Sequence, residues 1–162
     1  MPNNDLAGFD DLVTADGIAI GVLTADKDAL LGAMAARAAI ATGIEADIIL
    51  ERIQLREMLG STGFGGGAAI PHARFADLPG VIAIMAVTVT PVAFGAIDDQ
   101  PVDIAVLLLS PEAAGADHLK ALARISRTLR DPVRLNAIRD ARTDDELRTA
   151  ISAAREAPRR AA

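Results

Sequence analysis

Two nearly continuous apolar stretches, Val81–Val89 and Val102–Leu109, limit what this chain can fold into. Each has the length of one strand and is rich in aliphatic residues, which is typical of strands that are covered on both faces. A sheet buried on both faces needs helices on each side. The uncharged region 81–97 approaches the lower length limit of a membrane span, but its threonines and Pro91 favour two buried strands joined by a turn.

Helices are predicted on both sides of this strand region. Apolar residues at helical spacing, each run closed by a glycine, indicate helices at about Lys27–Thr42 and Ala46–Met58. After the strands, the patterns predict an amphipathic helix at about Asp117–Arg130, a short helix that starts at Asp131-Pro132, and a last helix from the capping box Thr143–Glu146 to about Ala154. Short additional strands are expected at about Ala68–Ile70 and Pro91–Ile97. These elements predict an α/β or α+β sandwich of a sheet and helices.

The composition fits one domain and excludes several classes of function. With 162 residues, 51% of them hydrophobic, the chain can build a single core, expected at about 9–155 between tails at 1–8 and 157–162. The net charge of −6 and the absence of Trp and Tyr argue against nucleic-acid binding, and the absence of Cys excludes disulfides and thiolate chemistry. The acidic N-terminus lacks the basic start of a signal peptide. We therefore expect a cytoplasmic protein that does not insert into a membrane.

The small set of reactive side chains directs attention to histidine. The chain has two histidines, His72 and His118, and histidine is the side chain that titrates near neutral pH. Pro71 restricts the backbone before His72, so the imidazole is presented in a defined direction. A loop histidine that only hydrogen-bonds its neighbours is the commoner explanation of such a pattern, and both interpretations stay open on the residues alone. No short metal-ligand spacing is present, so we predict no metal site.

A glycine-rich segment, Gly60–Gly67, precedes His72. It lacks the lysine of a P-loop, and its weak match to a dinucleotide fingerprint follows a helix where that fingerprint needs a strand. Two interpretations remain. The glycine amides form a nest that faces an anion, or the segment is a flexible connection between a helix and a strand.

Four short segments combine these residues in a fixed order: Leu-Arg-Glu-Met-Leu-Gly-Ser-Thr-Gly at 55–63, Ala-Ile-Pro-His at 69–72, Asp-Asp-Gln-Pro-Val-Asp at 98–103 and Asp-His-Leu-Lys-Ala-Leu at 117–122. Together they resemble the IIA component of the bacterial phosphoenolpyruvate-dependent phosphotransferase system, fructose/mannitol type. Within that family the chain is most similar to the nitrogen-regulatory branch. The similarity extends from about Asp47 to Ile151.

The resemblance implies a fold and a role for each matched residue. The implied fold is a mixed central sheet flanked by helices, and the implied activity is that of a phosphotransferase component that needs no cofactor. His72 falls on the phosphoacceptor histidine, Arg56 on the active-site arginine and His118 on the second histidine of the pocket. The residues Ser61, Thr62 and Gly63 fall in the loop that borders the pocket, and we expect them to bind phosphate.

The resemblance also implies the partners. His72 would accept a phosphoryl group from a phosphorylated histidine carrier protein, HPr-like or NPr-like. The resemblance favours a nitrogen-regulatory branch that acts on target proteins. One alternative is a sugar-specific IIA that passes the group to a IIB domain. Another is an interaction domain without phosphorylation that binds through the helix carrying Arg124 and Arg127. Two residues depart from the family pattern: Gly66 stands where relatives carry a polar residue, and Gly95 replaces a common acidic residue. These departures bear on rate or on the choice of partner.

Overall fold

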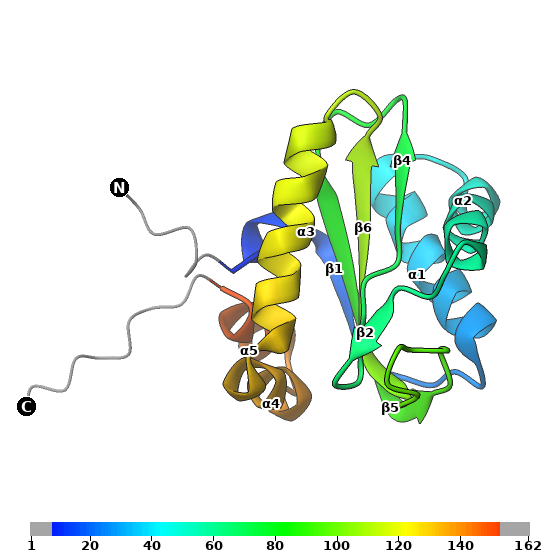
Figure 1. The fold of residues 1–162 in the computed structure, drawn as a ribbon. Helices are drawn as coiled ribbons and strands as arrows, with labels where there is room; N and C mark the ends of the chain where they lie inside the picture. The colour runs from blue at the N-terminus through cyan, green and yellow to red at the C-terminus, as the bar shows by residue number, and fades with distance from the viewer. Residues whose placement is uncertain (1–7, 153–162) are drawn as a thin grey trace, which may run out of the picture.

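The computed structural model describes residues 8–152, so the tail expected at 157–162 and nearly all of the one at 1–8 lie outside the described residues. A six-stranded mixed sheet lies between two layers of helices, with α1 and α2 on one face and α3, α4 and α5 on the other (Figure 1). The fold class predicted from the sequence is confirmed. The strands are β1 Val13–Val22, β2 Gly63–Gly65, β3 Ala68–Ala69, β4 His72–Phe75, β5 Ile82–Val92 and β6 Val102–Pro111. The helices are α1 Lys27–Thr42, α2 Ala46–Met58, α3 Gly115–Arg130, α4 Pro132–Asp140 and α5 Asp144–Ala150, preceded by a short 3-10 turn at Asp10–Leu12.

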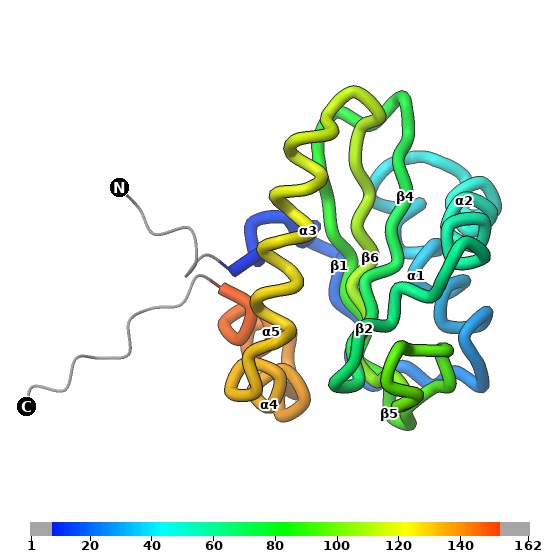
Figure 2. Tube along the Cα trace, viewed as in Figure 1, coloured from blue at the N-terminus to red at the C-terminus, as the bar shows by residue number. Residues whose placement is uncertain are grey.

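The topology places a short strand, β4, at an edge of the sheet. β5 pairs in parallel with β1 and antiparallel with β6, and these three are the long strands of the sheet (Figure 2). The other side of β6 pairs in parallel first with β3 and then with β4, which follow one another along it, and β2 pairs antiparallel with β3. The chain therefore leaves the sheet briefly between β3 and β4 and returns at His72.

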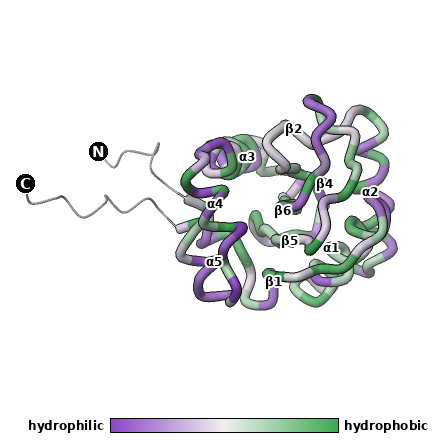
Figure 3. Tube along the Cα trace, turned by 90° about the horizontal axis from the view of Figure 1, so that it is seen from below, coloured by the Kyte–Doolittle hydropathy of each residue, from purple (hydrophilic) through white to green (hydrophobic). Residues whose placement is uncertain are grey.

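The two apolar runs became β5 and β6, and their side chains fill two hydrophobic cores, one on each face of the sheet. Along β6, Leu108 packs against the layer of α3, α4 and α5, whereas its neighbours Leu107 and Leu109 pack against α1 and α2. Each fully buried side chain of this size contributes roughly 1.5–3 kcal/mol of hydrophobic free energy. Figure 3 views the three layers end-on, with the sheet between the two groups of helices.

Helix boundaries follow the capping residues expected from the sequence. Gly43 closes α1 in the left-handed conformation, with φ 77°. The Asp131 side chain accepts a hydrogen bond from the Val133 amide at the start of α4, and the Thr143 hydroxyl accepts one from the Glu146 amide at the start of α5. None of the helices within residues 8–152 is long and apolar enough to cross a bilayer.

Several predictions about the strands are wrong. The separate strand predicted at Pro91–Ile97 is absent, because β5 continues to Val92 through a register shift against β6, and residues 93–97 form no strand. The first strand, β1, was not expected. The glycine-rich segment contains the paired strand β2 rather than loop alone, and His72 begins a strand. The last helix ends at Ala150, and the residues beyond 152 to which it was predicted to extend lie outside the described residues.

Candidate functional site

His72 begins the edge strand β4. Ala73 and Phe75 are buried in the core under α1 and α2. Because side chains alternate along a strand, His72 and Arg74 point to the opposite face, toward α3. The carbonyl oxygen of Pro71 accepts a hydrogen bond from the Leu108 amide at 2.9 Å, which fixes the point where the chain rejoins the sheet. His72 is half-buried in this position.

Two hydrogen bonds define which nitrogen of His72 carries its proton. Nδ1 lies 2.8 Å from the carbonyl oxygen of Ile70, and Nε of Arg56 lies 3.3 Å from Nε2. A carbonyl oxygen can only accept and a guanidinium can only donate, so Nδ1 carries the hydrogen and Nε2 carries the lone pair. Nε2 is therefore the nucleophilic nitrogen.

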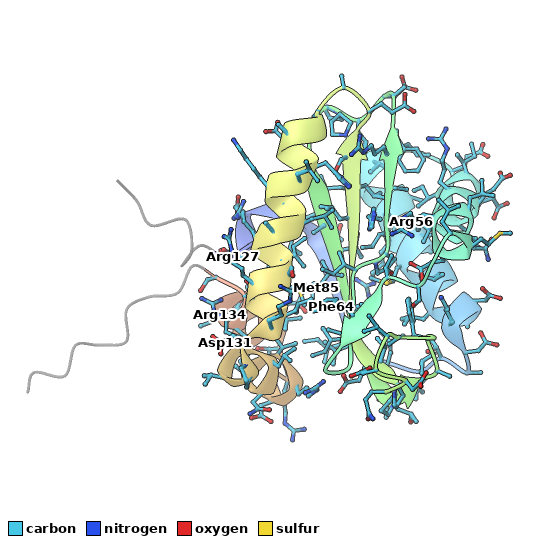
Figure 4. All side chains as sticks on the ribbon, in the orientation of Figure 1. Arg56, Phe64, Met85, Arg127, Asp131 and Arg134 are labelled. Atoms are coloured by element: carbon cyan, nitrogen blue, oxygen red, sulfur yellow. The ribbon has the colours of Figure 1, made fainter. Side chains whose placement is uncertain are left out.

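Arg56 comes from the last turn of α2 and reaches across the sheet edge to His72. Figure 4 labels it beside β4. Its Nη1 also donates to the carbonyl oxygen of Gly60 at 2.9 Å, so the end of α2 and the segment that follows it hold the guanidinium. A planar cation held in this way can bind a phosphoryl group through two oxygens.

His118 faces His72 from the first turn of α3. The two rings are tilted by 58° and their centroids lie 5.4 Å apart. His118 is 3% exposed, and its Nδ1 lies 2.6 Å from the hydroxyl oxygen of Ser110, which is fully buried near the end of β6. The structure thus brings together the three residues predicted as catalytic from the sequence: His72, Arg56 and His118.

Both histidines are neutral near pH 7. Burial lowers the pKa of His72, and the positive charge of Arg56 lowers it further, whereas the hydrogen bond to the Ile70 carbonyl opposes that shift. For His118, burial is again the main cause and lowers the pKa to about 4, with smaller contributions from Arg74 and His72. Neutral imidazoles can act as a nucleophile or as a hydrogen-bond donor without a proton being removed first.

The three predicted phosphate-binding residues form the segment beside Arg56. The Ser61 hydroxyl donates to the Phe94 carbonyl at 2.9 Å, and it accepts the Gly63 amide at 3.1 Å. The amide and hydroxyl of Thr62 both donate to the carboxylate of Glu57. Their polar atoms are thus bonded within the protein, and phosphate binding by these residues stays a prediction.

An ion pair between Lys27 and the buried carboxylate of Glu57 supports this segment. Glu57 is 9% exposed, and its carboxylate lies 2.9 Å from Nζ of Lys27. Lys27 also donates to the Phe94 carbonyl at 3.1 Å and lies over the Phe94 ring, 4.3 Å from its centroid. Lys27 and Glu57 therefore tie the start of α1 to the segment that borders Arg56.

The glycine turn between β2 and β3 is not an open anion nest. Gly65, Gly66 and Gly67 have positive φ angles of 110°, 69° and 85°. The Gly66 amide donates to the carboxylate of Asp98 at 3.1 Å, and its carbonyl accepts from Arg139 at 2.7 Å. A side chain of the protein therefore occupies the place that an anion would take at this amide.

Sequence reasoning missed four residues that act at or near the site: Lys27, Glu57, Arg74 and Ser110. Arg74 could have been found if β4 had been predicted, because residues two apart in a strand share a face. Ser110 had a weaker signal: it is a hydroxyl at the end of an apolar run. The Lys27–Glu57 pair joins two helices, so nothing local in the sequence indicates it.

Comparisons with known proteins show the family to which this chain is similar. Residues 11–154 match the family described as the phosphoenolpyruvate-dependent sugar phosphotransferase system, EIIA 2. The nitrogen regulatory protein of Bradyrhizobium diazoefficiens is 44% identical over 134 residues, which are 81% of this chain and 88% of that protein. The Escherichia coli nitrogen regulatory protein is 39% identical over 101 residues, 62% of each chain.

Solved structures show the same fold. The nitrogen regulatory protein IIA-Ntr from Neisseria meningitidis has a TM-score of 0.84 at 26% identity, covering 89% of this chain and 99% of that one. IIA mannitol from Escherichia coli has a TM-score of 0.73 at 17% identity, covering 86% and 99%. From the family match over most of its length, this chain belongs to the EIIA type 2 family of the phosphoenolpyruvate-dependent sugar phosphotransferase system.

Proposed function

We propose that this protein is a histidine phosphocarrier in which Nε2 of His72 accepts a phosphoryl group from a phosphorylated carrier protein of the HPr or NPr kind. The observation that carries the proposal is the lone-pair nitrogen of His72, held 3.3 Å from Nε of Arg56 at the sheet edge. A nucleophile and a permanent cation meet there, with a second neutral imidazole beside them.

The transfer moves one phosphoryl group between two imidazoles. The Nε2 lone pair of His72 forms a bond to phosphorus while the donor's N–P bond breaks and its electron pair returns to the donor ring. His72 keeps its Nδ1 proton, so positive charge develops on its ring as Nε2 gains phosphorus. The Ile70 carbonyl, which accepts from Nδ1 at 2.8 Å, stabilises that charge.

Arg56 changes partner during the step. In the free protein its Nε–H faces the Nε2 lone pair, and attack on phosphorus takes that lone pair away. The guanidinium can then donate to the phosphoryl oxygens while its other branch stays on the Gly60 carbonyl. Because phosphoryl transfer passes through a loose transition state, holding charge in place is the main task of the protein.

Ser61, Thr62 and Gly63 form the wall of the pocket next to Arg56. In this proposal they border the phosphoryl group, and the Ser61 and Thr62 hydroxyls exchange their partners within the protein, Phe94 and Glu57, for its oxygens. The Lys27–Glu57 pair holds the wall in position, because the Glu57 carboxylate binds Thr62 directly.

Exposed apolar side chains around the site fit a protein donor better than a small molecule. They follow or flank Arg56 on α2 and follow His118 on α3: Leu55, Met58, Leu59 and Leu119, between 56% and 84% exposed. Apolar residues gathered around a polar centre are typical of protein interfaces.

Identity of 44% to a nitrogen regulatory protein supports a regulatory role over sugar transport. Transfer to a IIB domain is the alternative, and an experiment distinguishes the two. The interaction-domain alternative has less support, because Arg124 donates to the Gly8 carbonyl and to the Asp11 carboxylate and so serves the fold.

The test is phosphorylation with phosphoenolpyruvate, the first enzyme of the system and its carrier protein. We expect one acid-labile phosphate on the parent protein and none on His72→Ala. A chase with IIB domains should leave the label in place for a regulator and remove it for a transport component. Labelling of His72→Ala equal to the parent, or no label on a folded parent, would contradict the proposal.

A further inference from the structure

Ser110 places a hydroxyl against the second histidine of the site. It lies on β6, where residues on the same face, such as Leu108, pack against the α3 layer. It is 0% exposed, and its Oγ is 2.6 Å from Nδ1 of His118. Neither the carrier reaction nor the packing of the core by itself calls for a hydroxyl there.

The direction of this hydrogen bond follows from counting donors. A serine hydroxyl has one hydrogen to donate, and His118 is the hydrogen-bond partner that the described part of the chain gives to Oγ. If Nδ1 of His118 carried a hydrogen and donated it, the Ser110 hydrogen would be buried without an acceptor, which is costly. If Ser110 donates to an unprotonated Nδ1, that penalty disappears. The hydrogen of the neutral His118 ring then lies on Nε2.

We propose that Ser110 is a positioning residue that holds His118 as its Nε2–H tautomer, so that His118 presents a hydrogen-bond donor to the phosphoryl group on His72. The proposal rests on the proposed phosphocarrier function. Ser110 reaches the reaction only through His118.

The two histidines of the site then have opposite tautomers, one set by the Ile70 carbonyl between β3 and β4 and the other by the Ser110 hydroxyl on β6. The Ile70 carbonyl accepts a hydrogen bond from Nδ1–H of His72, so the lone pair lies at Nε2. The Ser110 hydroxyl donates to the Nδ1 lone pair of His118, so the ring hydrogen lies on Nε2. One ring therefore supplies the nucleophile and the other a donor for the oxygens of the transferred group.

A neutral hydrogen-bond donor at His118 is suited to a phosphoryl group that must be transferred onward. Burial keeps the His118 ring uncharged at pH 7, so it contributes a hydrogen bond without a full ion pair to the phosphoryl oxygens. A charged imidazolium would hold the phosphoryl group more tightly and slow its release.

The experiment reads the tautomer of His118 directly. We would record ¹⁵N spectra of the imidazole rings in the full-length, unphosphorylated protein, because a protonated ring nitrogen is well separated from an unprotonated one. The parent should show His118 with its hydrogen on Nε2. Ser110→Ala should show a substantial fraction with the hydrogen on Nδ1, and it should accept phosphate from the carrier about tenfold more slowly.

A matched control removes another buried hydroxyl near the same helix. Thr128 lies on α3, and its hydroxyl donates to the Arg124 carbonyl without contacting His118. Thr128→Val should keep the parent tautomer and a labelling rate within about twofold of the parent. Ser110→Cys keeps the side-chain size and a weak donor, so its tautomer fraction and labelling rate should lie between those of Ser110→Ala and the parent. It replaces Ser110→Ala in the test if that variant does not fold.

Two results would overturn the proposal: a parent His118 with its hydrogen on Nδ1, or a Ser110→Ala variant whose tautomer and rate equal those of the parent. The spectra need no phosphorylation. A folded parent that takes no label therefore contradicts the phosphocarrier function, while the tautomer measurement still decides the role of Ser110.

Discussion

Nε of Arg56 and Nε2 of His72 lie 3.3 Å apart, and this hydrogen bond joins the end of α2 to the first residue of β4. The bond marks Nε2 as the nitrogen with the lone pair, and it keeps a cation at the point where phosphoryl charge arrives. The same contact has two separable consequences, one for the rate of transfer and one for the pKa of His72.

The rate consequence is tested by replacing the guanidinium. Arg56→Ala should slow phosphorylation by the carrier by about 100-fold to 1000-fold, the loss typical of removing one preorganised transition-state donor. Arg56→Lys keeps the charge but not the planar fork, so it should recover only part of the rate. Initial rates of acid-labile labelling measure both variants. Equal rates for Arg56→Ala and the parent would show that Arg56 serves the fold alone.

The pKa consequence is tested by titration. His72 reacts only when neutral, and burial with the Arg56 charge lowers its pKa from the ordinary 6.5. The fraction of reactive His72 should therefore decline at a lower pH than that of an ordinary histidine. NMR titration of the ring in the free protein measures this pKa, and Arg56→Ala should raise it. A parent pKa at or above 6.5 would contradict the burial seen here.

The Lys27–Glu57 pair predicts a difference between the two lysines of the chain. Lys27→Met leaves the buried Glu57 carboxylate without its cation, and we expect a loss of about 1–3 kcal/mol in the free energy of unfolding. Lys120 is exposed on α3, so Lys120→Met is the matched control and should change stability by less than about 0.5 kcal/mol. Urea denaturation measures both. Equal losses would mean that the ion pair contributes little to the fold.

The glycine turn predicts losses of different size at neighbouring positions. At Gly67 the φ is +85°, and an added Cβ would lie 2.5 Å from Nη2 of Arg139 and 2.9 Å from a carboxylate oxygen of Asp103. Gly67→Ala should cost about 2 kcal/mol or more, because it adds backbone strain to a broken contact. At Gly66 the φ is +69° and the nearest atom, on Leu135, is 3.7 Å away. Asparagine tolerates this conformation, so Gly66→Asn should cost less than about 1 kcal/mol. Thermal unfolding of both variants checks the ranking.

Local patterns predicted the elements whose signals are local. Helices α1 and α2 have apolar spacing and closing residues that can be read from a few neighbours, and β5 and β6 have long apolar runs. By contrast, β4 has four residues, and its pairing with β6 depends on a partner some thirty-six positions further along the chain, at Leu108 for His72. No pattern among neighbouring residues in the sequence indicates the pairing of β4 with β6.

The same distinction applies to the site. His72, Arg56 and His118 were predicted through the order of four segments, and the structure brings them together. Arg74 and Ser110 were missed because each acts through its position on a strand, and that position is fixed only when β4 pairs with β6. Apart from the local hydrogen bond between Nδ1 of His72 and the Ile70 carbonyl, the contacts that set the tautomers and charges at this site therefore depend on the tertiary fold.

The buried His118 should make the protein less stable as the pH falls from about 6.5 to about 4. Its pKa is lowered to about 4 in the folded state, from an ordinary value of 6.5 in the unfolded chain. Between these values the unfolded state binds more protons than the folded state. The contribution of neutral His118 to the free energy of unfolding is therefore fully present above pH 6.5 and is lost as the pH falls, by at most about 3 kcal/mol. Below about pH 4 both states are protonated and this contribution stops changing. Denaturant unfolding at several pH values, compared with His118→Gln, isolates the effect from the carboxylates that titrate in the same range. The parent should lose more stability than His118→Gln over that interval, and parallel pH profiles would show that His118 protonates as easily in the folded protein as in the unfolded chain.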